Sequence, residues 1–165
     1  MFAEGIRGRI RAISLVHELI LEKSLPSGMQ FEDYVLQLIG ELESIYYRGD
    51  AFEYHCEIAP LQLGLSANMH MGILLNELIS NSMKHARKEG EPLVIWVKLR
   101  QLGEELVLEY RDSGDGIPES AWKGEGESQG IGLMLVAAMV EQLEGTSEYL
   151  RARGGVFRLE FPLPG

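Results

Sequence analysis

Residues 76–86, with the sequence NELISNSMKHA, bring together the side chains of this chain that are best suited to chemistry. A helix turns about 100° per residue, so this segment would place a carboxylate, an amide and three basic groups on one side. Amide and carboxylate oxygens are ligands for magnesium, and lysine and histidine bind phosphate oxygens. The segment could therefore bind a metal-bound polyphosphate, although the pattern also suits a solvated helix face with i, i+4 pairs. The polar residues are Glu77, Asn81, Lys84 and His85, together with the third basic group, Lys88, two residues beyond the segment.

Two glycine-rich segments follow in the sequence. The first, DSGDGIP at 112–118, comes directly after the apolar run 106–110, and the second, GIGL at 130–133, opens an apolar-periodic helix that ends near Gly145. Glycines at such places let the backbone approach a ligand, and the free N–H groups of a helix start attract phosphate. Each segment alone is more often a turn or a packing feature. The three motifs together, in this order, favour a nucleotide site.

The order and spacing of these motifs resemble the N, G1 and G2 boxes of the GHKL ATPase superfamily, which includes histidine kinases, type II topoisomerases, heat-shock chaperones and MutL-type repair proteins. More narrowly, ILLNELISNSMKHA, DSGDGIP and QGIGLMLVAAMVEQLEG resemble the bacterial sensor histidine kinases with a short ATP lid. The resemblance covers roughly residues 50–162. It implies an ATP-dependent protein histidine kinase of a two-component system, with ATP and Mg²⁺ as cofactors and a response regulator receiver domain as partner.

The resemblance assigns a role to each matching residue. Asn81 matches the asparagine that ligates the magnesium bridging the ATP phosphates, and Glu77 matches the acidic position with a general-base or water-positioning role. Lys84 and His85 match positions that commonly contact phosphate or ribose. Asp112 matches the aspartate that accepts a hydrogen bond from the adenine amino group, which distinguishes adenine from guanine. The other expected ATP-binding residues shape the adenine pocket or close over the phosphates: Gly114, Gly116, Ile117, Gly130, Gly132 and Leu133.

Composition excludes several other classes. The net charge of -10 argues against a nucleic-acid-binding surface, which needs clustered lysine and arginine. The single cysteine, Cys56, excludes an internal disulfide framework and favours a cytoplasmic setting. No apolar run approaches about 20 residues, and no signal peptide is recognisable, so we expect no membrane contact by this segment. The chain begins within a helical pattern, so we expect it to be the cytoplasmic part of a longer sensor.

Helical periodicity over residues 3–24 predicts an amphipathic helix that ends at the LPSG sequence of 25–28. Its apolar face would need a partner, most simply a second copy of the chain, so we expect a homodimer. The resemblance identifies this helix as the second helix of a dimerisation region. The expected domains are thus residues 1–25, part of that region, and residues 26–165, the ATP-binding catalytic domain.

The catalytic part has the pattern of an α/β (α+β) fold. Residues 31–47 have the periodicity of a second helix. We expect a two-layer α/β sandwich, of the Bergerat type according to the resemblance, with a mixed sheet covered on one face by about three helices. The predicted strands lie at 52–58, 93–99 and 106–110, with a hairpin through residues 153–155 joining 149–150 to 156–161.

The segment between the two glycine motifs, residues 119–128, is polar and lacks periodicity. We interpret it as an ATP lid that orders on nucleotide binding. It departs from the commoner sensor-kinase lid, which is longer and carries a phenylalanine motif. Trp122 is its only aromatic residue, and it either packs the lid onto the domain or is an exposed loop residue.

The phosphoacceptor histidine is not assigned. His17, followed by Glu18 and Leu19, is similar to the acceptor context of many sensor kinases, but no Arg-Thr-Pro follows. The surrounding RIRAISLVHELIL instead resembles the second dimerisation helix of the short-lid kinases, whose acceptor lies on the preceding helix. We therefore do not expect His17 to be the acceptor, and we place the acceptor outside this chain.

Two alternatives share the fold. An anti-sigma-factor serine kinase would phosphorylate a serine on another protein, but such small kinases do not need the helix at residues 3–24. A non-catalytic histidine-phosphotransfer or scaffold protein would be expected to have lost motif residues, yet Asn81, Asp112 and the glycines are present. The signal, the response regulator and any phosphatase activity cannot be read from the sequence.

Overall fold

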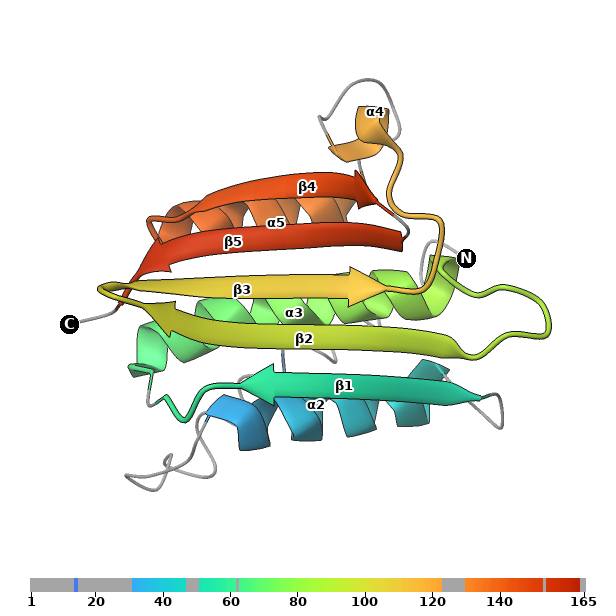
Figure 1. Ribbon diagram of the computed structural model, residues 1–165, viewed down its shortest axis with the longest axis horizontal. Helices are drawn as coiled ribbons and strands as arrows, with labels where there is room; N and C mark the ends of the chain where they lie inside the picture. The colour runs from blue at the N-terminus through green and yellow to red at the C-terminus, as the bar shows by residue number, and fades with distance from the viewer. Residues whose placement is uncertain are drawn as a thin grey trace.

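The computed structural model describes Ser14 and residues 31–46, 51–61, 63–122, 130–152 and 154–163. The helix expected over residues 3–24 lies outside them except for Ser14, and so do His17 and most of the predicted lid. Within them, one five-stranded sheet carries α2, α3 and α5 on one face (Figure 1). The predicted two-layer α/β class is confirmed, while the division at residue 25 stays a prediction.

The sheet is mixed, as the sequence predicts. Its strand order is β1-β2-β3-β5-β4, in which β1 and β2 are parallel and the other neighbours are antiparallel. Strict alternation of buried and partly exposed residues along most of β2 shows why these segments form strands, since every second side chain faces the helices. The strands are β1 (Phe52–Ile58), β2 (Leu93–Leu102), β3 (Glu105–Asp112), β4 (Thr146–Ala152) and β5 (Gly154–Pro162).

The helices form the second layer, and α3 runs behind the middle of the sheet between α2 and α5 (Figure 1). Residues 74–80 of α3 are all buried, because this helix contacts the sheet and both neighbouring helices. The sequence pattern also allowed this helix to have a fully solvated polar face, and the burial of Glu77 excludes that interpretation at this residue. The helices are α2 (Phe31–Tyr46), α3 (Leu65–His85), the short α4 (Glu119–Trp122) and α5 (Ile131–Gln142). No helix among the described residues has the length and apolar character needed to cross a membrane.

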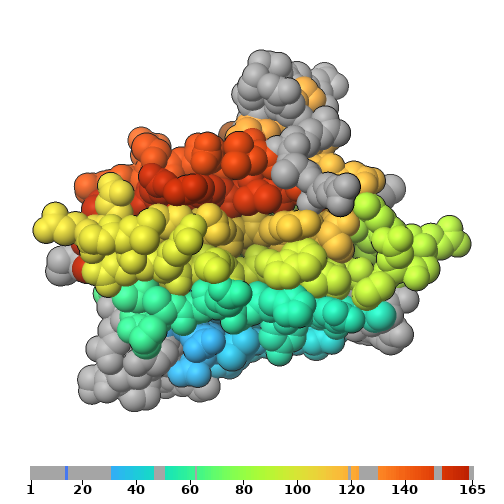
Figure 2. Space-filling model, viewed as in Figure 1, coloured from blue at the N-terminus to red at the C-terminus, as the bar shows by residue number. Residues whose placement is uncertain are grey.

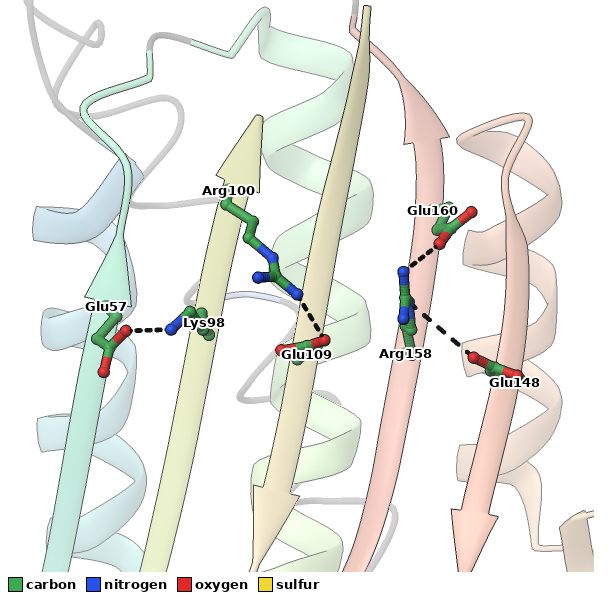
Figure 3. A network of polar contacts seen from close by, with 7 residues as sticks. All are labelled: Glu57, Lys98, Arg100, Glu109, Glu148, Arg158 and Glu160. Atoms are coloured by element: carbon green, nitrogen blue, oxygen red, sulfur yellow. Dashed lines mark hydrogen bonds and ion pairs between the residues drawn. The ribbon is translucent and has the colours of Figure 1, made fainter. Parts of the chain in front are cut away.

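The other face of the sheet is lined by the side chains of the strands themselves (Figure 2). Opposite charges alternate across neighbouring strands on this face and point toward one another (Figure 3). Exposed pairs of this kind contribute little to stability, but opposite charges on adjacent strands favour this register over a shifted one. The pairs between neighbouring strands are Glu57 with Lys98, Arg100 with Glu109, and Arg158 with Glu148, and Arg158 also pairs with Glu160 on its own strand.

The contact between α2 and α3 depends on Gly72. A Cβ atom at this position would lie 2.0 Å from Oη and 2.8 Å from Cζ of Tyr34, a buried ring whose hydroxyl pKa is raised by burial. Gly40 on α2 is a matched glycine within a helix, with open space around its absent side chain.

We expect Gly72→Ala to lower the free energy of unfolding by about 1–2 kcal/mol, because Tyr34 must shift within a packed core. Gly40→Ala should instead raise it by about 0.5–1 kcal/mol, since alanine restricts the unfolded chain and favours the helix. Urea denaturation of both variants measures the difference. A gain in stability for both would contradict the packing role of Gly72.

Candidate nucleotide-binding site

The three sequence motifs meet at a cavity of about 320 Å³ between α3, the start of α5 and the loop after β3. This volume lies within the range of small-molecule sites. Its walls combine apolar side chains with a few polar groups. The cavity lining includes eight residues expected from the sequence, namely Asn81, His85, Asp112, Gly116, Ile117, Gly130, Gly132 and Leu133.

Three expected residues do not line this cavity. Glu77 lies one turn before Asn81 on α3, and its side chain is only 1% exposed. Lys84 extends toward α2, where its Nζ lies 5.0 Å from the ring centroid of Tyr46. A Cβ at Gly114 would lie 2.5 Å from Cβ of Ala86, so this glycine allows the loop to pack on the end of α3. The roles expected for these three residues stay predictions, and the position of Lys84 does not support a phosphate contact.

Asp112 lines the cavity and is held by groups from its own loop and from α3. Its Oδ1 accepts a hydrogen bond from the backbone N–H of Gly114 at 2.9 Å, and its Oδ2 accepts one from Oγ of Ser82 at 2.5 Å. Asp112 thus accepts a hydrogen bond from its own loop and still lines the cavity, because a carboxylate has about four acceptor positions.

The loop after Asp112 is tied to its surroundings on both sides. Ser113 exchanges two hydrogen bonds with Val94 on β2, at 2.9 Å through its N–H and 3.0 Å through its Oγ. The N–H of Ile117 donates to Oη of Tyr149 at 2.5 Å. Gly116 has φ of +79°, and a Cβ there would lie 2.8 Å from the same hydroxyl. Glycine is thus required for both the backbone conformation and the close approach.

The start of α5 also lines the cavity. Gly130 is the N-cap residue of the helix and has no side chain with which to cap the first N–H groups. Uncapped N–H groups and the positive end of the helix dipole form an anion-binding site. Asn81 and His85 line the same cavity, so an anionic group could contact an amide, an imidazole and backbone donors together. The cavity therefore offers a carboxylate that could bind a base and a helix start that could bind phosphates.

Residues 67–165 match the family model described as "Histidine kinase-, DNA gyrase B-, and HSP90-like ATPase". The chain belongs to this ATPase family. Family membership implies an ATP-binding domain. The family match spans all three motifs and the strands between them, which agrees with the single cavity that they form.

Two named relatives are a histidine kinase and a sensor protein. The chain is 30% identical over 107 residues to the signal transduction histidine-protein kinase AfsQ2 of Streptomyces coelicolor, a match covering 56% of this chain and 19% of the relative. It is 26% identical over 113 residues to the sensor protein CitS of Bacillus subtilis, covering 62% of this chain and 20% of the relative. The matched region thus spans about a fifth of the length of these relatives.

Solved structures show the same fold. The histidine kinase domain of the Erythrobacter litoralis EL346 blue-light activated kinase superposes with a TM-score of 0.77 at 20% identity, covering 95% of this chain and 74% of that one. The Acinetobacter baumannii histidine kinase AdeS superposes with a TM-score of 0.65 at 16% identity, covering 95% and 76%. At these identities the similarity establishes the fold of this ATPase domain.

Several residues of this ATPase cavity were not expected from the sequence. Ser82, Tyr110, Tyr149 and Phe157 all line it. Ser82 directly follows Asn81 in the N-box motif, so its position next to the site could have been inferred. Tyr149 and Phe157 come from β4 and β5, and no local pattern indicates that this hairpin reaches the nucleotide site.

Trp122 packs onto the ATPase domain. Of the two alternatives that the sequence left open, lid packing and an exposed loop residue, the structure supports the first. Its ring stacks on Tyr149 with centroids 5.1 Å apart and meets Phe157 edge-on at 5.4 Å. Tyr149 in turn accepts the hydrogen bond from the loop at Ile117. The start of the predicted lid is therefore fixed to the wall of the cavity.

Proposed function

We propose that this chain is the ATP-binding catalytic domain of a two-component sensor histidine kinase, which transfers the γ-phosphate of ATP to a histidine outside the chain. The observation that carries the proposal is the single cavity whose lining includes Asp112, Asn81, His85 and the start of α5. This arrangement suits an adenine at the carboxylate and a polyphosphate at the helix terminus. Phosphoryl transfer needs mainly positioning and charge neutralisation, which such a site can supply.

Magnesium would enter this site together with the nucleotide. Among the described residues, no group of three or more His, Cys, Asp or Glu side chains could hold a metal ion. Mg²⁺ commonly keeps several waters and binds through one or two protein ligands plus substrate phosphates. The side chain of Asn81 fits this role because its residue lines the cavity. When bound, the ion would neutralise charge on the phosphates, while Glu77 would act behind Asn81 as a base or water-positioning group.

The wider setting belongs to the same proposal. We infer a cytoplasmic kinase that passes its phosphate to a response regulator receiver domain and that forms a homodimer through residues 3–24. The segment at 3–24 lies almost wholly outside the described residues, so the support for the dimer is its amphipathic sequence pattern.

The test is to incubate the chain with Mg-ATP labelled at the γ-phosphate and a separately expressed peptide that carries the phosphoacceptor helix. We expect an acid-labile, alkali-stable label on a histidine. An acid-stable label on serine would support the serine-kinase alternative, and folded protein that transfers no label would support the scaffold alternative.

Within this assay, Asn81→Ala is expected to reduce transfer by at least about tenfold, because one ligand for the metal–phosphate group is lost. The affinity for ATP should also become nearly independent of magnesium, as measured by calorimetry with and without EDTA. A variant whose ATP affinity still depends on magnesium as in the wild type would refute the metal role of Asn81.

A further inference from the structure

A chain of hydroxyl groups connects the interior of the sheet to Asp112. Oη of Tyr110 lies 2.6 Å from Oγ of Ser82, and Ser82 donates to Oδ2 of Asp112 at 2.5 Å. Both hydroxyl-bearing residues are almost completely buried. They come from different elements, because Ser82 lies on α3 and Tyr110 lies two residues before Asp112 on β3. The carboxylate is thus contacted from the helix layer as well as from its own loop.

The proton of Ser82 has two acceptors within reach, the carbonyl of Leu78 at 3.1 Å and Oδ2 of Asp112 at 2.5 Å, and the shorter, charge-assisted contact favours Asp112. A serine hydroxyl has a single proton, and Asp112 as a carboxylate can only accept. If Ser82 donates to Asp112, Tyr110 is left to donate to Ser82 at 2.6 Å or to the carbonyl of Leu78 at 3.3 Å. Burial and the nearby charge of Asp112 raise the pKa of Tyr110 well above its usual value, so its proton is retained. Successive donations in one direction strengthen one another.

The result is a carboxylate with both oxygens anchored. Gly114 contacts Oδ1 from the loop and Ser82 contacts Oδ2 from α3, which fixes the plane of the group. Each oxygen retains acceptor capacity for a ligand. Because the Asp112 side chain is already held in place, it loses less conformational entropy when a ligand binds, which favours binding.

We propose that Ser82 and Tyr110 are positioning residues that hold the Asp112 carboxylate as an oriented acceptor and so determine selectivity for a purine with an amino group at its six position. This inference rests on the proposed nucleotide function. Ser82 directly follows Asn81. The same turn of α3 therefore carries the residue that positions Asp112 and the residue proposed to bind the magnesium and phosphates.

The test compares Ser82→Ala with Ser80→Ala, using Mg-ATP and Mg-inosine triphosphate as the two probes. Ser80 is an equally buried serine on α3, but its Oγ bonds to the backbone carbonyl of Glu77 instead of Asp112. Inosine triphosphate has a carbonyl at the six position and cannot donate there. Calorimetric titration gives the affinity of each protein for each nucleotide.

We expect Ser82→Ala to weaken ATP binding about tenfold and inosine triphosphate binding less than about twofold, which narrows the discrimination between them. Ser80→Ala should leave both affinities within about twofold of the wild type. Tyr110→Phe should weaken ATP binding less than Ser82→Ala does, and it should add no further loss in the Ser82→Ala background, because Tyr110 acts through Ser82.

The outcomes separate this inference from the proposed function. If folded wild-type protein binds no ATP, the proposed function fails. If the wild type binds ATP but Ser82→Ala retains its affinity and its discrimination, the nucleotide function stands and the positioning role is refuted. Equal losses for both nucleotides in Ser82→Ala would also refute it, since they would indicate a general disturbance of the cavity.

Discussion

Asp112→Asn is expected to lower the affinity of this chain for ATP about 100-fold, which corresponds to about 2.8 kcal/mol. Asparagine keeps the volume of the side chain, but it replaces one acceptor oxygen with an amino group. The hydroxyl of Ser82 and the N–H of Gly114 both donate to Asp112, so two donors already compete for the single remaining oxygen. An adenine amino group would lose a charge-assisted hydrogen bond and would also face a donor.

Calorimetric titration with Mg-ATP measures this loss, and Mg-GTP tests the preference for adenine. Glu109→Gln is a matched control, because Glu109 lies on the same strand but pairs with Arg100 at 2.9 Å on the opposite face of the sheet. The control should bind ATP within about twofold of the wild type. Wild-type affinity in Asp112→Asn would show that this carboxylate does not bind the base.

Gly154→Ala is expected to lower the free energy of unfolding by about 3 kcal/mol and to weaken ATP binding as well. Gly154 has φ of +76°, a conformation that costs energy for alanine. A Cβ there would also lie 2.2 Å from the backbone carbonyl oxygen of Asp112. The turn of the β4–β5 hairpin therefore cannot accept a side chain without displacing the end of β3.

Gly90→Ala separates the energetic cost of the backbone conformation from the cost of the steric contact with Asp112. Gly90 has φ of +79° but nothing within 4 Å of its absent side chain, so its substitution measures the backbone cost alone, about 1 kcal/mol. Urea denaturation of both variants gives the difference. Equal destabilisation would show that the contact with Asp112 carries no cost and that the hairpin can move aside.

The local patterns of the sequence determine the elements of this fold. Alternation predicts β1 over Phe52–Ile58, and helical periodicity predicts α2 within one residue of its observed Phe31–Tyr46. These predictions succeed because residues on one face of a strand or helix are close in the sequence. The start of α3 at Leu65 is not predicted, because its N-cap residue, Gly64, has no side chain to form a capping hydrogen bond and therefore gives no side-chain capping signal in the sequence.

The sequence by itself also determined which motifs meet. Asn81, Asp112 and Gly130 all line the cavity, as expected from their types and order. What only the tertiary structure decided is which side chains support them. Lys84 contacts Tyr46, Trp122 stacks on Tyr149, and Ser82 reaches Asp112.

The physical reason is the distance along the chain between the partners. Ser82 and Asp112 are 30 residues apart, and Ile117 and Tyr149 are 32 apart. Periodicity states which face of an element is buried, but it does not state which element packs on that face or in which register. Those contacts form only when α3 and the β4–β5 hairpin pack around the end of β3, next to the cavity proposed to bind the nucleotide.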